Sequence, residues 1–580
     1  MSEVCVELVG KLVGEMLGLS KEELSPSDNL ISLGLGSLDI MRIAGLLTKN
    51  GCNVTFSELV SNPCMASWVN FARERSARSS SNGSPLLGSA NYSKGDPFPI
   101  TSVQHAYMVG RRDGQELGGT ACHAYMEFEC GSLDAAKLER AVELLILRHP
   151  MLRARFSDDG TARIEDKVTW KGLTTYRVEG AGNPDSRIEG IRQELSHLRF
   201  DIEQDDLIDV RLTVVSPKRT IMHINVDLLA ADVLSIQVLL EDLAHLYDGT
   251  DLAPIEIDFM EYARRTGIGE DARNEDREYW LNRIDNMPGG PSLPLKAPME
   301  SVKRSQFTRM EYLIDSKSWK NFTEKGRQIG VTQSMGIAAV YAKALSRWSE
   351  DKKFLLNLPL FNRKPIHPDV DKIVSDFTSL ILLEADCANA ISLLELASQM
   401  QGRFQQDVAH SSFGAVEVLR ELSHRCPNDP KKAPVVFASN IGTQFISNKV
   451  EDVFGPLSKM LAETPQVLLD HQIYDHKNGL LLAWDYVSEL LDDKIAKQMF
   501  EAYCTAVRFY CENDWSEPFP DLLPPSQRAA RAEANSEGAD LGGGTLHGRF
   551  FARAQAEPDA PALRWGADGE ATYGLSLIHI

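Results

Sequence analysis

Apolar side chains recur at helical spacing in two stretches near the N-terminus. Residues 4–19 and 37–51 each place Leu, Val, Ile or Met near a 3.6-residue period, which is typical of an amphipathic helix. Shorter patterns of the same kind cover residues 56–59 and 66–71. We therefore expect a small all-α domain of four helices over residues 1–75.

Strand-like and helix-like runs alternate in the long region that follows, residues 98–512. The runs typical of strands are residues 220–227, 353–361, 433–439 and 479–487, and those typical of helices are 133–149, 331–349 and 390–408. The alternation predicts an α/β class, and a region of this length exceeds one ordinary hydrophobic core. We expect two lobes, residues 98–285 and 286–512, with a cleft between them.

Stretches rich in Pro, Gly and Ser mark the seams of the chain. The sequence "NMPGGPSLPLKAP" at residues 286–298 is the candidate crossing between the lobes, although a surface loop within one lobe is the alternative. Residues 76–97 and 513–544 are interpreted as linkers. The remaining residues, 545–580, are too few for a complete domain, so we expect the chain to be the front of a longer protein.

Composition and charge narrow the classes of partner. The 580 residues are 43% hydrophobic and 25% charged with a formal net charge of −21, and no block of Lys or Arg interrupts them. This balance argues against nucleic acid or an anionic membrane as the main partner. Nine scattered cysteines without a CxxC pair predict reduced thiols, a cytoplasmic location and no metal site. No apolar run is long enough for a membrane-spanning helix.

Ser37 follows two glycines at the expected start of the second helix. Gly34 and Gly36 allow a tight turn in "NLISLGLGSL", which presents Ser37 at a helix N-terminus. The local pattern alone favours a simple N-cap. A phosphodiester attached to Ser37 would, however, meet free backbone N–H groups and the positive end of the helix dipole.

The stretch "DLLAADVLS" places two carboxylates where a strand passes into a helix. Asp227 ends the apolar alternation of "IMHINVD", Asp232 is placed to cap the next helix, and Ser235 falls three residues later. A turn and a cap without chemistry explain this pattern equally well. A metal site is disfavoured because no third or fourth ligand lies nearby in the sequence.

The N-terminal unit resembles the peptidyl or aryl carrier domains of nonribosomal peptide synthetases. The sequence "LGLGSLDIMR" keeps the leucines, Gly34 and Ser37 of the carrier pattern, but Gly36 stands where an aspartate is usual. The resemblance implies that Ser37 carries covalent 4′-phosphopantetheine, attached by a phosphopantetheinyl transferase.

Residues 98–512 resemble the heterocyclization domains of the same synthetases, which are relatives of condensation domains. Eight motifs occur in the family's order: "FPITSVQHAYMVGR", "RHPMLRARF", "DLLAADVLS", "PSLPL", "RWSEDKKFLLNLPLFNR", "VSDFTSLILLE", "PVVFASNIG" and "TPQVLLDHQ". The third is the D-x-x-x-x-D-x-x-S signature that replaces the HHxxxDG of amide-forming relatives. The resemblance implies a two-lobed α/β fold like that of chloramphenicol acetyltransferase.

The resemblance also implies roles for individual residues. Asp470 is the expected catalytic acid and base of ring formation, oriented by Gln472 and Thr464; taken alone, it would be interpreted as a solvated loop aspartate. Asp227, Asp232 and Ser235 form the signature and are the further candidates for the catalytic site. Asp227 stands where relatives have their first histidine, and it either handles protons or only shapes the tunnel.

Two further expectations concern the signature and the ring-forming step. Asp232 is expected to pair with Arg148 or Arg153 and so to hold the cleft together. Many family members have the sequence "PVVFTS", whose threonine is implicated in dehydration, and Ala438 stands in its place here. Either Ser439 or another hydrogen-bond donor takes over this role, or cyclization is weaker.

The order of the domains implies an initiating module of a siderophore synthetase of the pyochelin type. A separate aryl-AMP ligase would load the carrier with salicylate, which is then condensed with cysteine and cyclodehydrated to a thiazoline. Residues 545–580 resemble the entry to an adenylation domain, which would precede a further carrier domain. The alternatives are a domain that forms only the amide bond and a non-catalytic docking platform for carriers.

Overall fold

The structure is a computed structural model that divides the chain into two compact units, Met1–Leu522 and Leu523–Ile580. The described residues are 2–17, 19–20, 24–35, 37–49, 52, 54, 58–59, 62–78, 95–178, 183–266, 270–361, 363–364, 366–426, 431–536, 545–565 and 569–575.

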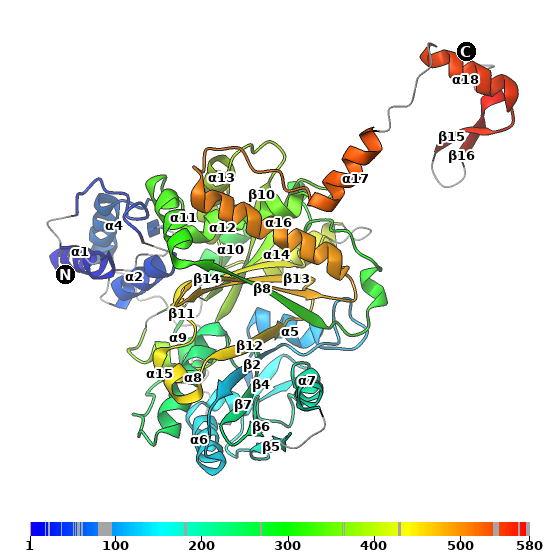
Figure 1. Ribbon diagram of the computed structural model, residues 1–580. Coiled ribbons are helices and arrows are strands. Elements are labelled where there is room, and N and C mark those ends of the chain that lie inside the picture. Colours follow the sequence, from blue (N-terminus) through cyan, green and yellow to red (C-terminus); the bar gives the residue numbers. More distant parts are fainter. Residues whose placement is uncertain are drawn as a thin grey trace. The chain divides into compact units, whose positions relative to one another are not determined.

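The N-terminal domain is all-α, as predicted. Its described helices are α1 (Ser2–Leu17), α2 (Ser37–Lys49) and α4 (Met65–Arg78) (Figure 1). They bury Val13, Ile43, Leu47 and Trp68, and the Trp68 indole donates a hydrogen bond to the Leu59 carbonyl at 2.9 Å.

The helix expected at residues 56–59 falls partly outside the described residues, although residues 58 and 59 are helical. Helix α4 is longer than the expected 66–71 and reaches into the segment interpreted as a linker, of which residues 79–94 lie outside the description.

The sequence led us to expect that every cysteine is reduced, but one of the described cysteines is not. Cys52 is disulfide-bonded. The cysteines found free are Cys64, Cys122, Cys130, Cys387, Cys426, Cys504 and Cys511. The prediction of reduced thiols is therefore wrong at Cys52, a difference that the spacing of the cysteines could not signal.

The first lobe is built on a five-stranded sheet with the order β12-β2-β7-β6-β5. Its strands are β2 (His123–Cys130), β5 (Thr174–Arg177), β6 (Ile208–Ser216), β7 (Arg219–Asp227) and β12 (Leu457–Glu463). Helices α6 (Ala135–Arg148) and α8 (Val233–Tyr247) pack against each other on this lobe, which also contains α7 (Pro184–Leu195). A small sheet of β1 (Phe98–Pro99), β4 (Thr161–Ile164) and β3 (Ala154–Ser157) completes it.

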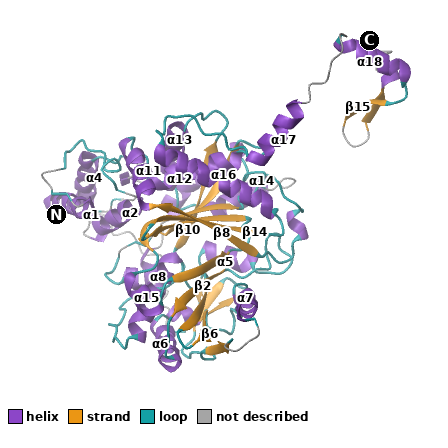
Figure 2. Ribbon diagram, in the orientation of Figure 1, coloured by secondary structure: helices purple, strands orange, loops and turns teal. Residues whose placement is uncertain are grey.

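The second lobe is built on a six-stranded sheet with the order β10-β9-β11-β13-β14-β8. Its strands are β8 (Phe307–Asp315), β9 (Lys353–Phe361), β10 (Thr378–Asp386), β11 (Val435–Gln444), β13 (Leu469–His476) and β14 (Gly479–Val487). Figure 2 shows its helices gathered on one side of this sheet: α11 (Ser316–Gln328), α12 (Gln333–Ser346), α13 (Leu393–Val408) and α16 (Asp493–Glu512).

Among the described residues, no helix combines the length and the apolar character that a membrane crossing needs.

The crossing between the lobes lies earlier than predicted. Phe259 and Tyr262 of α9 (Phe259–Thr266) belong to the core of the first lobe, whereas Trp280 of α10 (Glu270–Leu281) belongs to that of the second. Residues 286–298 run along the second lobe, where the Gly290 amide donates to the Lys432 carbonyl at 2.6 Å. The alternative interpretation of this stretch, a loop within one lobe, is the one that the structure supports.

A late segment of the chain returns to the first lobe, so the lobes are not two contiguous halves. Strand β12 pairs antiparallel with β2, with Met460 opposite Met126. Helix α15 (Asn448–Phe454), which precedes it, packs against α8. The apolar pattern could not reveal this return, because pairing partners far apart in sequence leave no local periodicity.

The second unit contains α17 (Pro525–Ser536), α18 (Leu546–Ala556) and a hairpin of β15 (Pro561–Trp565) and β16 (Gly569–Thr572). Helix α17 occupies part of the segment predicted to be a linker, and residues 537–544 lie outside the description. The start of that segment is ordered as well, because Trp515 is 2% exposed and packs in the second lobe.

Close packing of Trp515 on α12 gives a test of the second-lobe core. A Cβ at Gly336 would overlap the Trp515 ring, whereas a Cβ at Gly402 in α13 would meet nothing within 4 Å. We expect Gly336→Ala to lower the free energy of unfolding by about 1–3 kcal/mol through overpacking. The matched control Gly402→Ala should raise it by about 0.5–1 kcal/mol through helix propensity. Urea denaturation of both variants checks this, and equal stabilities would contradict the packing.

Candidate active site between the two lobes

A cavity of about 540 Å³ lies between the two lobes. Helix α5 (Ser102–Gly110) and the start of α8 line it from the first lobe, and β9, β10, β11 and β13 line it from the second. Its polar lining includes Tyr107, Asp232, Asn357, Asp376, Asn440, Thr464, Asp470, Gln472 and Tyr474. The structure thus brings several of the predicted site residues to one cavity.

Strand β13 supplies the polar side chains at the centre of the cavity. Alternation along the strand turns Asp470, Gln472 and Tyr474 toward the cavity. His471 faces the opposite side, where its Nε2 lies 2.7 Å from the Tyr503 hydroxyl of α16. Asp470 is therefore not a solvated loop residue but part of a central strand.

Asp470 has one paired and one unpaired oxygen. Its Oδ2 accepts a hydrogen bond from Gln472 Nε2 at 2.6 Å, while its Oδ1 has no partner among the described residues. Burial raises the pKa of Asp470 to about 7, and the charge of Asp485 adds to the rise, against the effects of Gln472 and Arg309. A carboxyl with such a pKa can both give and take a proton near neutral pH.

A buried ion pair between the neighbouring strands β14 and β8 fixes the orientation of Gln472. Arg309 of β8 donates to both oxygens of Asp485, at 2.7 and 2.6 Å, and to Gln472 Oε1 at 2.8 Å. Tyr474 also donates to Gln472 Oε1. Since its oxygen is occupied twice, Gln472 must direct its amide nitrogen to Asp470. The prediction that Gln472 orients Asp470 agrees with this geometry.

Asp227 lies outside the lining of the cavity. Both of its oxygens accept from Arg111 Nη1, at 3.0 and 2.8 Å, and Oδ1 also accepts from the Leu229 amide at 3.0 Å. Asp227 is fully buried and Arg111 is 4% exposed. This arrangement makes Asp227 an ion-paired structural residue, in contrast to its place among the catalytic candidates.

Asp232 and Ser235 begin α8 and contact the second lobe. Asp232 Oδ1 accepts from the Ser235 amide at 2.7 Å, which is the predicted N-cap. The same oxygen accepts from Arg363 Nη2 at 2.9 Å, and Ser235 Oγ accepts from that nitrogen at 2.8 Å. The signature motif is therefore a bridge from the first lobe to Arg363, which follows β9.

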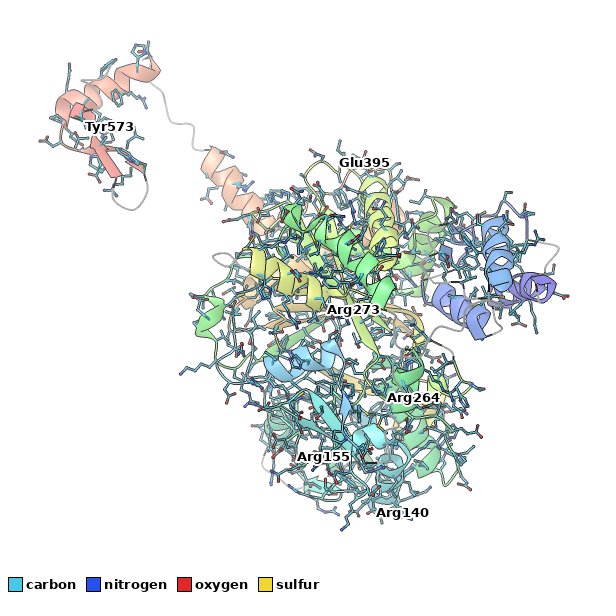
Figure 3. The ribbon with its side chains drawn as sticks, turned by 180° about the vertical axis from the view of Figure 1, so that it is seen from behind. Arg140, Arg155, Arg264, Arg273, Glu395 and Tyr573 are labelled. Carbon is cyan, nitrogen blue, oxygen red and sulfur yellow. The ribbon has the colours of Figure 1, made fainter. Side chains whose placement is uncertain are left out.

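The predicted pairing of Asp232 with Arg148 or Arg153 is wrong. Arg148 donates to Asp242 at 2.7 Å, and Arg153 donates to the carbonyls of Glu165 and Ile146. Arg155 of the same motif, labelled in Figure 3, pairs with Asp206 in the first lobe. These arginines stabilise the first lobe internally. The arginine that joins the two lobes is Arg363, which lies in the motif "RWSEDKKFLLNLPLFNR".

The neighbours of Ala438 also differ from expectation. Ala438 lines the cavity on β11, but Ser439 points away and its hydroxyl lies 2.8 Å from that of Ser334 on α12. Ser439 therefore cannot replace the missing threonine. Thr464 and Tyr474 are hydroxyl side chains that do line the cavity.

Sequence reasoning missed Asp376, which precedes β10 in the motif "VSDFTSLILLE". Asp376 lines the cavity and is 1% exposed, and burial raises its pKa to about 7. The available signal was a charged residue shortly before an apolar strand, which does not separate a cavity-facing charge from a surface one. Among the described residues, no group of three or more His, Cys, Asp or Glu could hold a metal ion.

Ser37 is the first residue of α2, as the sequence predicts. Gly34, with φ of 119°, makes the turn before it in a conformation that favours glycine, whereas Gly36 lies outside the described residues. A helix start after a glycine turn fits a phosphodiester, since the first-turn backbone N–H groups have no partners within the helix.

The raised pKa of Asp470 predicts a pH dependence of stability. The folded state holds a proton that the unfolded chain releases above about pH 4, so stability should fall as pH rises from about 4 through about 7. Asp470→Asn removes this contribution to the free energy of unfolding. At pH above 7, the wild type should therefore have lost up to roughly 4 kcal/mol of stability that Asp470→Asn does not lose. Urea denaturation at both ends of the range measures it, and parallel pH profiles would contradict the assignment.

Comparison with known proteins identifies the two domains. The condensation domain family matches residues 98–513, and the phosphopantetheine attachment site family matches residues 7–72. Phenyloxazoline synthase MbtB of Mycolicibacterium paratuberculosis is 35% identical over 575 residues, covering 97% of this chain and 48% of the relative. Pyochelin synthetase PchE of Pseudomonas aeruginosa is 34% identical over 565 residues, covering 96% of this chain and 39% of the relative.

A solved structure agrees with these relatives. The cyclization-docking bidomain of the EpoB synthetase from Sorangium cellulosum is 30% identical with a TM-score of 0.66, covering 73% of this chain and 87% of that one. The chain spans less than half the length of the two curated relatives. From its carrier domain, its condensation fold and its cavity, the chain belongs to the condensation-domain family of nonribosomal peptide synthetases, as a module of the heterocyclization type.

Proposed function

We propose that the chain condenses a carrier-bound aryl acid, salicylate, with cysteine and cyclodehydrates the amide to a thiazoline. The observation that carries the proposal is Asp470, a buried carboxyl with a free Oδ1 in the cavity between the lobes. Ring formation needs a group that takes and returns protons at one carbon, and a carboxyl with a pKa of about 7 is suited to that task.

The proton transfers of the ring-forming stage can be followed atom by atom. Asp470 takes the proton of the cysteine thiol as the sulfur adds to the amide carbon, and returns it to the former carbonyl oxygen. It then takes the proton of the amide nitrogen as the C=N bond forms, and gives it to the hydroxyl that leaves as water. Gln472 holds Asp470 Oδ2 throughout, so Oδ1 faces the substrate.

The residues at Ser37 fit the attachment of 4′-phosphopantetheine. Ser37 begins α2 after the turn at Gly34, and a helix N-terminus favours the binding of a phosphodiester. The bound group supplies a flexible arm that holds an acyl chain as a thioester. A phosphopantetheinyl transferase and a separate aryl-AMP ligase are the partners that this role requires, and we place the reaction in the cytoplasm.

Downstream domains complete the proposed module. We interpret residues 545–580 as the entry to an adenylation domain that activates the amino acid, followed by a carrier domain. One relative is named a phenyloxazoline synthase, and this name supports an aryl substrate and a five-membered ring. Serine or threonine in place of cysteine would give an oxazoline by the same steps.

A second candidate function is favoured by one residue. Ala438 leaves no hydroxyl at a cavity position where many heterocyclization domains have threonine. An enzyme that stops at the amide would show this change. The buried Asp470, whose Oδ2 is held by Gln472 and whose Oδ1 is free, favours the ring-forming enzyme over this candidate and over a carrier-docking platform.

The carrier assignment predicts covalent modification at Ser37. Incubation with a phosphopantetheinyl transferase and coenzyme A should add one phosphopantetheine, detected by intact-protein mass spectrometry. Ser37→Ala should stay unmodified, while Ser32→Ala, a nearby serine in the turn before α2, should react like the wild type. An unmodified wild-type chain would refute the carrier role.

The ring-forming assignment predicts a change of product in Asp470→Asn. Supplied with salicyl-loaded chain and a cysteinyl-loaded carrier, the wild type should form a product lighter than the amide by one water. Asp470→Asn should accumulate the open amide, with ring formation slower by roughly 10²–10⁴-fold. Asp475→Asn, on the same strand but outside the cavity lining, is the matched control and should cyclize normally. Normal cyclization by Asp470→Asn would exclude the assignment.

A further inference from the structure

Asp376 is a buried carboxyl in the cavity that the ring-forming stage leaves unused. Its Oδ1 accepts from the Thr378 amide at 3.0 Å, while its Oδ2 has no partner among the described residues. A buried, unpaired carboxylate oxygen is costly, so native proteins seldom keep one without a reason. Because Asp376 lines the cavity, a ligand that enters the cavity can supply the missing partner.

The signature motif holds the chain on both sides of Asp376. Ser235 Oγ donates to the Ser375 carbonyl at 2.7 Å and accepts from the Ser375 amide at 3.0 Å. Asp232 donates its amide to the same carbonyl at 3.1 Å, and its Oδ2 accepts from the Phe377 amide at 3.3 Å. The clamp fixes both neighbours of Asp376 and leaves its carboxyl pointing into the cavity.

The positive charge of Arg363 is not available to Asp376. Arg363 pairs with Asp232, and its guanidinium lies over the Phe377 ring at 4.2 Å. Among the described residues, no Lys, Arg or His forms an ion pair with Asp376. The carboxylate can therefore receive a cation from outside the protein.

The other unpaired atoms of the cavity lining have the same character. Besides Asp376 Oδ2, they are Oδ1 of Asn357, Asn440 and Asp470, within the described part of the chain. All four are oxygen atoms, which accept hydrogen bonds. An ammonium group, with three N–H donors and a positive charge, is the complementary partner.

Asp376 and Asp470 lie in separate surroundings. Strands β9 and β11 separate β10, which Asp376 precedes, from β13 with Asp470. Burial raises the pKa of Asp376 to about 7, the bond from Thr378 opposes the rise, and the charge of Asp232 adds to it. An α-amino group has a pKa of about 7.7–8.0, so proton transfer between it and Asp376 is nearly balanced.

We propose that Asp376 is a second catalytic residue, which binds the α-ammonium group of the incoming amino acid and takes its proton during amide formation. The inference rests on the proposed function, because it assigns the first of the two stages. Asp376 would serve the amide and Asp470 the ring. Asp232, Ser235 and Arg363 are then positioning residues for Asp376.

The bonds and protons of this stage balance. One N–H proton passes from the ammonium group to Asp376 Oδ2, and the nitrogen lone pair forms the bond to the acyl carbon. The C–S bond of the thioester breaks, and the sulfur leaves with a second proton from the nitrogen as a thiol. The nitrogen keeps one hydrogen as the amide N–H, and Asp376 later releases its proton to water.

The test compares total product and product ratio in single-turnover reactions of the full chain. In Asp376→Asn the summed rate of amide and thiazoline should fall by roughly 10²–10⁴-fold, with the ratio of ring to open amide unchanged. Asp376→Glu should recover part of the rate. Asp386→Asn is the matched control at the other end of β10. Asp386 Oδ1 likewise accepts a hydrogen bond from the backbone amide two residues later, and this variant should keep the wild-type rate.

A stability measurement shows that Asp376→Asn is folded and reports on the carboxyl itself. In the wild type, Asp376 lowers the free energy of unfolding as pH rises from about 4 through about 7. The variant should not show this contribution. A wild-type summed rate in Asp376→Asn, or accumulation of open amide as in Asp470→Asn, would overturn the inference and leave the proposed function intact. Failure of the wild type to form any amide would instead reject the proposed function.

Discussion

The ion pair between Asp232 and Arg363 joins the two lobes beside the cavity. Asp232 caps α8 of the first lobe, and Arg363 follows β9 of the second, with N–O separation of 2.9 Å. Both side chains are almost fully buried, so neither charge has water as an alternative partner. Removing one partner of such a pair typically costs about 3–5 kcal/mol, because it leaves the other charge buried alone. The placement of α8, which lines the cavity from the first lobe, against the second lobe depends on this contact.

The return of the chain to the first lobe reinforces the same arrangement. Strand β12 pairs with β2 of the first lobe, and the next strand, β13, lies in the centre of the second-lobe sheet. Thr464, which faces the cavity, lies in the connection between them. The residues that carry the proposed ring chemistry are thus tied to both lobes by backbone hydrogen bonds, independently of the ion pair.

The sequence predicted the regular elements well and the long-range contacts poorly. The expected strands at residues 353–361 and 479–487 agree with β9 and β14, because continuous apolar runs report burial directly. The lobe crossing and the partner of Asp232 were wrong, because both depend on which distant residues meet. Asp470 was found through the family motif, whereas Asp376 and Arg363 lay within quoted motifs without a local feature that separates a cavity-facing charge from a surface one.

Infrared difference spectroscopy of the carboxyl groups tests the central claim, that the cavity holds two separately titrating carboxyls. Spectra at about pH 5 and about pH 8 would be recorded for the wild type, Asp376→Asn and Asp470→Asn. The account predicts two protonated-carboxyl bands in the wild type that disappear on titration near pH 7, with one band missing from each variant. Carboxyls that are already ionised at the lower pH, or a single shared band lost in both variants, would contradict it.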